Sequence, residues 1–461
     1  MRRINQSRKP GALLSYLAVA LLLASPAASR GQGTVSNPPA QPNVPFDWTD
    51  ADNGYHLVRL TNQPGSTALD SRRNAFTPDG KDMIYTSKLG IHTIDLATRR
   101  TQVVVRGRVG SLAVGTKTRR VFFSRGTDAY LYVADIDTGA ISKVGELPAL
   151  AEIMSVNADE TLIVGKSVEP GGKVFIQFRL DATRKLIEEK KVDPSVQVTD
   201  DAINERASKM RAAAKIPEDI FTVDIRTGQI NTILHTTDWI GYAQFSPTDP
   251  DLIMYAHEGM YYESDRIWTM RSNGSQNQLI HQRTTKEESA TLEFWSPDGK
   301  TIWYEWQNPR GKNYALVGYD VATGKRTLLK MEKGEASISY NEANGNGLFC
   351  GAGHRAISAK EGSNRAGKQS IELLYTVFIN NKIQGDPNLP NLFDFNDQIA
   401  NTYPDTKYAG FFRRVTIANM FKNDYTKLEP NIRFSPNNKL VIFTSNMLGP
   451  TYIFAVELGA N

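Results

Sequence analysis

The sequence predicts an all-β fold, a seven-bladed β-propeller with loop and helical insertions. A turn motif recurs seven times along the chain. Most copies are followed by strands that fill about 40 to 45 residues, which is the period of one propeller blade. A third observation is the alternating segment at residues 55–60, ahead of the first motif. We expect this segment to complete the last blade and close the ring, so that no sheet edge is left open.

The recurring motif is an aromatic or apolar residue, then a turn rich in Pro, Asp, Asn and Gly, then an apolar strand. Clear copies begin at Phe76, Phe245, Trp295 and Phe434, and weaker copies begin at Gly115, Asn157 and Tyr340. Pro presets φ for the turn, and Asp-Gly or Asn tolerates its tight end. Each copy therefore predicts a hairpin between two strands of one blade.

Two long gaps between motifs indicate insertions into a propeller that we assign to residues 54–461. The first insertion, about residues 182–217, has a helical composition over residues 200–214. The second, about residues 353–420, combines a strand at residues 373–378 with a loop rich in Pro and Asn. Insertions in repeat folds usually decorate one face, often the binding face.

The first 29 residues have the pattern of a secretory signal peptide. Basic residues come first, an apolar run covers residues 12–24, and small residues follow. The run is shorter than the roughly 20 residues that span a bilayer. We therefore predict a cleaved signal, a linker at residues 30–53 and a periplasmic or secreted protein without a membrane span. An uncleaved anchor is the alternative.

The charge of the chain gives no support for a nucleic-acid partner. The chain has 54 basic and 49 acidic residues, and four of the basic residues lie in the first nine positions. The mature protein is thus close to neutral. The single cysteine, Cys350, cannot form an intramolecular disulfide. Nothing in the sequence indicates the oligomeric state.

Several segments resemble the oligogalacturonate lyase family, seven-bladed propellers that split short pectin fragments. These segments are FSPTDPDLIMYAHEGMYYESDRIW at residues 245–268, LEFWSPDGK at 292–300, KLEPN at 427–431 and SNMLGPTY at 445–452. The SPDG turns are shared with TolB-like and WD40-like propellers. The HEG segment at residues 257–259 and the DRIW segment at residues 265–268 are more specific.

The resemblance implies β-elimination of an acidic oligosaccharide. This reaction removes the C5 proton of a uronate, beside its carboxylate, and expels the glycosidic oxygen at C4. A general base must reach the proton. A divalent cation or an arginine must neutralise the carboxylate as negative charge develops. The family uses a histidine base and a manganese ion held largely by histidines.

This chain departs from the family pattern at the expected histidines. Tyr242 stands where the family has its base histidine, and Leu292 stands where the family has one metal-binding histidine. The family's Gln-x-x-His-x-His group aligns with Thr426, Glu429 and Asn431 of this chain. The chain has six histidines, and no pair of them has metal-ligand spacing. A histidine-rich manganese site is therefore excluded.

Two hypotheses follow from the resemblance. In the first, the protein is a lyase with altered ligands: Tyr242 or His257 is the base, and Glu293, Glu429 and Asn431 hold a divalent cation such as Mn²⁺ or Ca²⁺. Asp265, Arg266 and Tyr261 are then the substrate contacts. In the second, the scaffold binds an acidic sugar without cleaving it, or serves protein interactions as a TolB-like propeller.

Each candidate residue also has a structural interpretation. His257 could form hydrogen bonds within the propeller, because polar groups at a strand end need partners. Asp265 and Arg266 could form an ion pair between blades, and Tyr261 could pack between blades instead of stacking on a sugar. The paired arginines, including Arg72 and Arg73, suit a polyanionic sugar, although most such pairs are solvated turn residues.

Overall fold

The computed structural model describes residues 45–49, 55–126, 128–260, 263–310, 314–330, 338–343, 348–357, 369–378, 412–416, 430–445 and 450–458. All of them lie in one compact unit, Val44–Asn461. The predicted signal peptide falls outside the described residues. Strand β1 (Asp47–Thr49) lies inside the segment 30–53 that we expected to be a linker, so ordered structure begins earlier than predicted.

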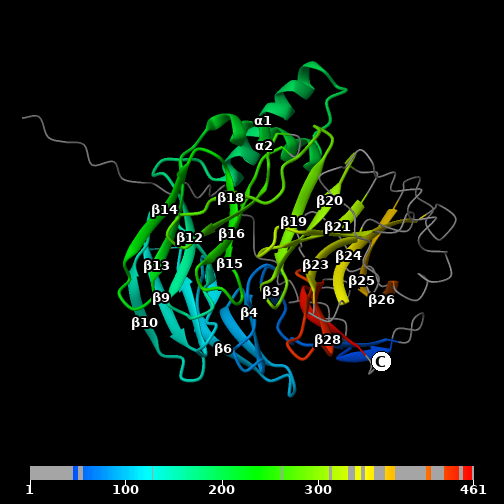
Figure 1. Ribbon diagram of the computed structural model, residues 1–461. Helices are drawn as coiled ribbons and strands as arrows, with labels where there is room; N and C mark the ends of the chain where they lie inside the picture. The colour runs from blue at the N-terminus through cyan, green and yellow to red at the C-terminus, as the bar shows by residue number, and fades with distance from the viewer. Residues whose placement is uncertain are drawn as a thin grey trace, which may run out of the picture. The chain divides into compact units, whose positions relative to one another are not determined.

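The described strands form seven antiparallel sheets, six of them built from four strands that follow one another in the chain (Figure 1). Sheet 1 is β3 (Thr67–Ala68), β4 (Asp82–Ser87), β5 (Gly90–Asp95) and β6 (Thr101–Arg106). Sheet 2 is β7 (Leu112–Val114), β8 (Arg120–Ser124), β9 (Tyr130–Asp135) and β10 (Ile141–Glu146). Sheet 3 is β11 (Glu152–Val156), β12 (Leu162–Val168), β13 (Glu218–Asp224) and β14 (Ile230–Thr236).

Sheets 4 to 6 repeat this order. Sheet 4 is β15 (Ile240–Phe245), β16 (Leu252–His257), β17 (Ile267–Arg271) and β18 (Gln278–Leu279). Sheet 5 is β19 (Ser289–Trp295), β20 (Thr301–Gln307), β21 (Tyr314–Asp320) and β22 (Arg326–Lys330). Sheet 6 is β23 (Ile338–Ala343), β24 (Leu348–Ile357), β25 (Gln369–Phe378) and β26 (Phe412–Thr416). The predicted insertion at residues 353–420 therefore supplies two strands of a sheet, β25 and β26.

Sheet 7 is closed by the two ends of the chain. It contains β27 (Arg433–Phe434), β28 (Leu440–Ser445) and β29 (Tyr452–Glu457), followed by β2 (His56–Arg59) and β1. Leu57 pairs with Val456, and Arg59 pairs with Phe454. The expected pairing of the N-terminal strand with the C-terminal strand is confirmed. The inner strands of successive sheets are neighbours, and β3 lies beside β28 and β29. The predicted all-β propeller class is thus confirmed.

Local hydrogen bonds explain why the recurrent motif forms hairpins. The Thr77 hydroxyl donates to Asp79 at 2.6 Å and accepts the Asp82 backbone N–H at 3.1 Å. Ser296 forms the same pair of bonds with Asp298 and the Thr301 backbone N–H. The turn needs a positive φ, which is 68° at Gly80 and 67° at Gly299. The motif thus forms its turn with its own side chains.

The second turn of a sheet uses an Asp and a Thr three residues later. Asp95, Asp135, Asp224 and Asp320 each accept hydrogen bonds from the backbone N–H and the hydroxyl of that Thr. This arrangement is an Asx turn, in which a side chain replaces a backbone acceptor. The outer strand of each sheet therefore starts at a defined residue.

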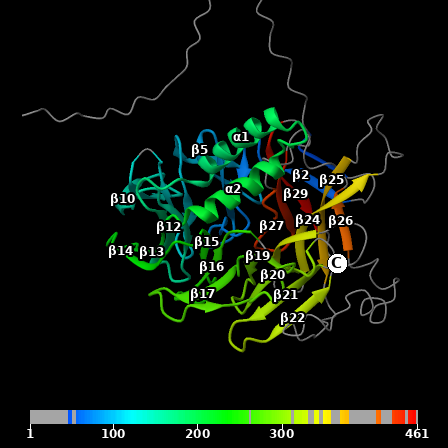
Figure 2. The same cartoon turned by 90° about the horizontal axis from the view of Figure 1, so that it is seen from above.

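Two helices form a hairpin between β12 and β13, where the first insertion was predicted. Helix α2 (Asp200–Ala214) is the segment with the helical composition, and α1 (Phe175–Val192) begins before the predicted insertion. Phe178, Ala182 and Ala207 form the small core between the helices. The two helices lie side by side at one end of the sheets (Figures 1 and 2). Among the helices of the described residues, none is long and apolar enough to cross a membrane.

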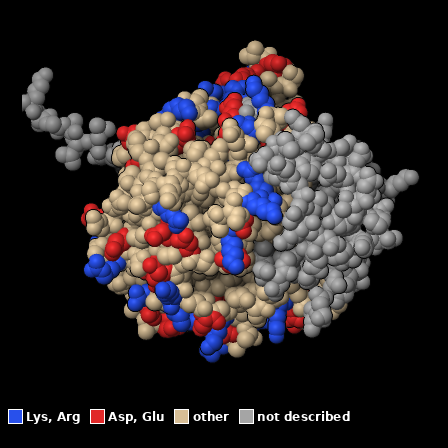
Figure 3. Space-filling model, viewed as in Figure 1, with Lys and Arg blue, Asp and Glu red and all other residues tan. Residues whose placement is uncertain are grey.

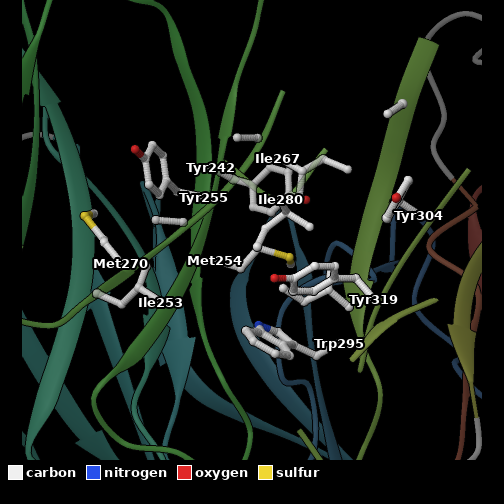
Figure 4. Packing of buried hydrophobic residues seen from close by; sticks show 14 of the residues in the cluster. Tyr242, Ile253, Met254, Tyr255, Ile267, Met270, Ile280, Trp295, Tyr304 and Tyr319 are labelled. Carbon is white, nitrogen blue, oxygen red and sulfur yellow. The ribbon is translucent and has the colours of Figure 1, made fainter. Parts of the chain in front are cut away.

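The core lies between neighbouring sheets, as in other stacked repeat folds. One large cluster joins sheets 4 and 5, with Met254, Ile267 and Trp295 among its members (Figure 4). Burial of such apolar surface contributes roughly 25 cal/mol per Å². The sheets are therefore held together by apolar packing, while the polar groups discussed next gather at the inner strands.

Candidate functional site

Two neighbouring inner strands carry β-bulges that place polar side chains at the centre of the ring. In β15 the register shifts between Ile240 and Ala243, and in β19 it shifts between Thr291 and Phe294. Leu292 has a φ of 58°, in the left-handed region. A bulge re-aims side chains and is common beside active sites. Here the bulges contain Tyr242 and Glu293.

Arg266 connects sheets 4 and 5 through two carboxylates, of which Glu293 is fully buried and Glu258 is partly buried. Its Nε atom donates to the Glu293 carboxylate at 2.9 and 3.1 Å, and its two Nη atoms donate to Glu258 at 2.5 and 2.9 Å. Burial alone would raise the pKa of Glu258, but the Arg266 charge and hydrogen bonds hold that pKa below its usual range. The predicted substrate contact Arg266 therefore forms the ion pair between sheets that was the alternative interpretation.

A loop at residues 69–75 occupies the centre of the ring. Arg73 donates to the carbonyls of Leu112 in β7 and Ile153 in β11, and Arg433 of β27 donates to the carbonyls of Leu69 and Asp70. These partners belong to inner strands of three different sheets. The loop is thus held from several sides of the ring.

Two arginines of this loop are paired with carboxylates at the ring centre. Arg72 forms a salt bridge with Asp70 at 2.6 Å, and its guanidinium carbon lies 4.3 Å from the centroid of the Tyr242 ring. Arg73 forms a salt bridge with Glu152 at 2.6 Å. Burial would raise the pKa of Asp70, but Arg72 lowers that pKa to about 2. The Asp70 carboxylate is therefore ionised at neutral pH, and both Asp70 and Glu152 have an arginine partner.

Tyr242 is buried, and its hydroxyl is occupied. The hydroxyl donates to the backbone carbonyl of Glu293 at 2.9 Å. Burial and the nearby Glu293 carboxylate raise the pKa of Tyr242 well above its usual range. A tyrosine that holds its proton so firmly is a poor general base. The contacts thus favour a structural role for Tyr242 over the base that the family alignment suggested.

His257, the other predicted base, lies at the end of β16 against aromatic rings. Its ring stacks on Trp268 with centroids 5.1 Å apart, and its Nδ1 atom is 3.7 Å from a carboxylate oxygen of Asp238. Its Nε2 atom is buried and has no hydrogen-bond partner. Burial lowers the pKa of His257 from 6.5, opposed by the charge of Asp238. The imidazole is therefore neutral at neutral pH.

His257 lines a cavity of about 820 Å³ on the face that carries the helical hairpin. The walls come from the link between β16 and β17, from β19 and β20, from Arg310 and from Asn204, Glu205 and Ser208 of α2. Helix α2 is anchored beside the cavity: Arg211 pairs with Glu218 in a fully buried salt bridge, and Glu218 accepts the Ile240 backbone N–H at 2.8 Å. The cavity thus has a firmly attached helical wall.

A second, smaller cavity of about 130 Å³ lies at the ring centre between the loop 69–75 and β15. Arg72, Tyr242 and Glu258 line it. Glu258 also lines the larger cavity, so the two cavities adjoin at this residue. The structure therefore brings together three of the predicted site residues, Tyr242, Arg266 and Glu293, with His257 on the adjoining wall.

The remaining predicted residues lie elsewhere or outside the described residues. Asp265 pairs with Arg283 at 3.1 Å, and its carbonyl accepts the Trp268 indole N–H, so its contacts are structural. Asn431 donates to the Ala68 carbonyl at 3.0 Å. Tyr261 and Glu429 fall outside the part of the chain that the structure describes.

The described residues do not fit the predicted metal site. The Glu293 carboxylate is fully buried and bound by Arg266. The side-chain amide of Asn431 donates to the Ala68 carbonyl of sheet 1. No cluster of three or more His, Cys, Asp and Glu side chains that could hold a metal occurs among the described residues. In the described site, carboxylates are neutralised by arginine where the family pattern suggests a cation.

Sequence analysis missed several residues of the site. Glu258 stands in the HEG segment and Arg72 in an arginine pair, and both patterns were visible in the sequence. Asn204 and Ser208 of α2 carried no such signal, because nothing local indicates which face of an inserted helix lines a cavity. Their role depends on how the hairpin packs against residues 239–240, where Phe175 stacks on Trp239 at 4.9 Å.

Comparison with known proteins shows which proteins this chain resembles. Among relatives of known function, an oligogalacturonate lyase of Dickeya dadantii and an oligogalacturonide lyase of Pectobacterium atrosepticum are each 24% identical over 242 residues. Each match covers 52% of this chain and 55% of the relative. The chain thus spans about half the length of the curated relatives it matches.

Solved structures show the same fold. An oligogalacturonate lyase in complex with manganese superimposes with a TM-score of 0.63 at 20% identity, over 89% of this chain and 95% of that one. An oligogalacturonate lyase from Vibrio parahaemolyticus gives a TM-score of 0.64 at 19% identity, over 89% and 96%. The family model described as oligogalacturonate lyase matches residues 214–460, more than half of the sequence. The chain belongs to the oligogalacturonate lyase family.

Proposed function

We propose that this protein binds acidic oligosaccharides of the oligogalacturonate type in the 820 Å³ cavity and cleaves them by β-elimination, with His257 as the general base. The observation that carries the proposal is the state of His257. His257 is a neutral imidazole, and its Nε2 atom has no hydrogen-bond partner. The residue lines the cavity and lies within the region that matches the family model. We also propose that each of the seven sheets is one blade of the ring.

The chemistry assigns roles to residues of the cavity wall. The imidazole accepts the C5 proton of the uronate, and the electron pair left at C5 forms the C4–C5 double bond as the C4–O bond breaks. The departing glycosidic oxygen takes a proton from water, and the imidazolium later returns its proton to solvent. Arg310 lines the same cavity, and a guanidinium can bind a carboxylate bidentately as charge develops on it. Arg266 holds Glu258 and Glu293 in place behind this wall.

The test of this proposal is the ultraviolet absorbance of the unsaturated uronate formed from oligogalacturonate. Wild type should form this product, and His257→Gln should reduce its rate by at least about 100-fold, the usual contribution of a positioned base. The matched control is His235→Gln, because His235 is exposed on the outer strand β14 and pairs with Asp219 at 2.6 Å. Equal rates in wild type and His257→Gln would contradict the base assignment.

The same assay with added Mn²⁺, Ca²⁺ or EDTA examines the predicted cation. Since Glu258 and Glu293 are bound by Arg266, we expect EDTA to leave the rate and the thermal melting temperature unchanged. A rate that depends on Mn²⁺ or Ca²⁺ would support the ligand set that includes Glu429.

A second candidate function is sugar binding without cleavage. Two observations favour this function. Tyr242 stands where the family has its base, but its hydroxyl proton is donated to the Glu293 carbonyl. The Glu293 carboxylate, a predicted metal ligand, is bound by Arg266. Calorimetric binding of oligogalacturonate with no absorbance change would support this function. Absence of both binding and cleavage would contradict both proposals and favour a protein-interaction propeller.

We further propose that the protein is exported to the periplasm or outside the cell after removal of its signal peptide. The basic, apolar and small-residue segments at the N-terminus support this proposal. Mass spectrometry of the mature protein should find an N-terminus within about residues 29–32. Intact Met1 in a membrane fraction would contradict it.

A further inference from the structure

A third cavity, of about 730 Å³, lies on the same face of the ring as the proposed site. Lys88 in the link between β4 and β5 and Arg108 in the link between β6 and β7 line its rim. The larger site cavity is lined by the equivalent links of sheets 4 and 5 and by the hairpin inserted in the equivalent link of sheet 3. Because consecutive antiparallel strands reverse direction, these links all emerge at one face.

The three cavities adjoin one another at shared lining residues. Asp70, Arg73 and Glu152 line both the third cavity and the small central cavity. Glu258 lines both the central cavity and the cavity of His257. The three cavities therefore lie in a row, here called the groove, from sheets 1 and 2, past the loop 69–75 at the ring centre, to sheets 4 and 5.

The charge that the third cavity offers to a ligand is positive. Its two acidic residues, Asp70 and Glu152, are already paired with Arg72 and Arg73. Lys88 and Arg108 are exposed, and no described carboxylate forms a salt bridge with either. Arg106 at the end of β6 and Arg125 in the link between β8 and β9 lie close together, since Arg125 donates to the Arg106 carbonyl at 3.4 Å, and neither forms a salt bridge within the described residues. Elsewhere cations and carboxylates are mostly interspersed on the surface, as on the face in Figure 3.

The interior of the cavity suits a hydroxyl-rich ligand. Ser87, Ser111 and Ser124 line it together with several glycines, which leave the space open. The Ser111 and Ser124 hydroxyls lie 3.1 Å apart. Small hydroxyl side chains both donate and accept hydrogen bonds, as sugar hydroxyls require. The rim thus offers cations, and the walls carry hydroxyl groups that also bond within the protein, Ser87 to His92 and Ser111 to the Ile153 backbone N–H.

We infer that this third cavity is a second binding site for uronate units, which holds the far end of an oligosaccharide whose reacting end lies beside His257. Lys88 and Arg108 are specificity-determining residues that bind carboxylates of the distal units. The inference rests on the proposed function and extends it, because the protein would then bind longer oligosaccharides more tightly than shorter ones.

The test compares digalacturonate with hexagalacturonate by calorimetry on the full mature chain. Wild type should bind hexagalacturonate more tightly, and Lys88→Gln with Arg108→Gln should weaken hexagalacturonate binding about tenfold. Binding of digalacturonate should change by less than about twofold, since it fills the site near His257 alone. The loss for hexagalacturonate should shrink in high salt, because exposed charges are screened.

The matched control is Lys117→Gln with Arg120→Gln, which removes the same charge at the opposite face of sheet 2, where Lys117 lies in the turn between β7 and β8 and Arg120 begins β8. This control should bind both sugars as wild type does. Unchanged hexagalacturonate binding in the Lys88 and Arg108 variant, or an equal loss for both sugars, would overturn the inference alone. If wild type binds neither sugar, the proposed function fails as well.

Discussion

Tyr242 shows how a single side chain can keep the position of a catalytic residue while its contacts give it another role. Its hydroxyl holds the backbone of β19 through the Glu293 carbonyl, and its ring lies under Arg72. The family alignment alone suggests a base at this position. The buried hydrogen bond indicates a structural link between sheets 4 and 5.

We predict that Tyr242→Phe lowers the free energy of unfolding by about 1 to 3 kcal/mol, because it leaves the buried Glu293 carbonyl without its donor. Lyase activity and its pH dependence should stay close to wild type, since the aromatic ring is kept. Chemical denaturation and the absorbance assay measure the two effects. Abolished activity in a stable Tyr242→Phe protein would instead identify Tyr242 as the base.

A buried polar cluster behind the site provides a second residue-scale prediction. Glu288 accepts hydrogen bonds from His281 at 2.7 Å, from the Trp306 indole at 2.6 Å and from the Thr284 backbone at 2.6 Å. Burial would raise the pKa of Glu288, but His281 and these donors lower it from 4.5 to about 2. The ionised carboxylate is therefore stabilised in the folded state.

Because the folded pKa of Glu288 is depressed, its contribution to stability is fully present above about pH 4.5 and is lost as the pH falls toward 2. Glu288→Gln should lower the free energy of unfolding by about 3 kcal/mol at neutral pH. The difference between wild type and variant should narrow below pH 4.5 in denaturation curves. A constant difference down to pH 3 would contradict the assignment.

The element that most shapes the cavity is the helical hairpin. The family match begins at residue 214, where α2 ends, so the hairpin lies outside the matched region. Its anchors are the buried Arg211–Glu218 pair and the stack of Phe175 on Trp239. These contacts fix α2 as a wall of the cavity.

We predict that Ser208→Trp weakens oligogalacturonate binding about tenfold, because the indole occupies space that the sugar needs. Ser and Trp have similar helix propensities, so the free energy of unfolding should change by less than about 0.5 kcal/mol. Lys190→Trp on the exposed side of α1 is the control. Equal affinity in both variants would show that α2 does not contact the sugar.

At the scale of the whole molecule, stability depends on closure of the ring by the chain ends. Leu57 and Val58 of β2 are fully buried against sheets 7 and 1, whereas β1 is largely exposed. Without β2, strand β29 would present an open edge. The two N-terminal strands therefore differ in importance.

We predict that a chain starting at residue 54 has a melting temperature close to that of wild type. Its free energy of unfolding should fall by about 1 to 2 kcal/mol, because the contacts of Phe46 and Trp48 are lost. A chain starting at residue 61 should be unstable and prone to aggregation, because β29 and the core around Leu57 are uncovered. Differential scanning calorimetry measures the melting temperature of each truncated chain, and light scattering measures its aggregation. Similar melting of the two truncations would show that β2 does not close the ring.

The sequence by itself determined the propeller class, the hairpin positions and the pairing of the two chain ends. Those features rest on local chemistry: Thr77 and Ser296 bond to residues within five positions, and residues 55–60 alternate like a strand ahead of the first turn motif. Only the tertiary structure decided the partners of the polar site residues. Arg266 meets Glu293 across two sheets, and Arg72 meets Tyr242 across the ring centre.

The physical reason is that these partners depend on bulges and on a loop whose path is set by several sheets at once. A bulge at Leu292 re-aims Glu293, and the loop 69–75 is held by carbonyls and side chains of sheets 2, 3 and 7. Neither feature leaves a periodic signal in the chain. Local sequence patterns thus determine the scaffold. Long-range packing determines that Arg266 pairs with Glu258 and Glu293 in the site.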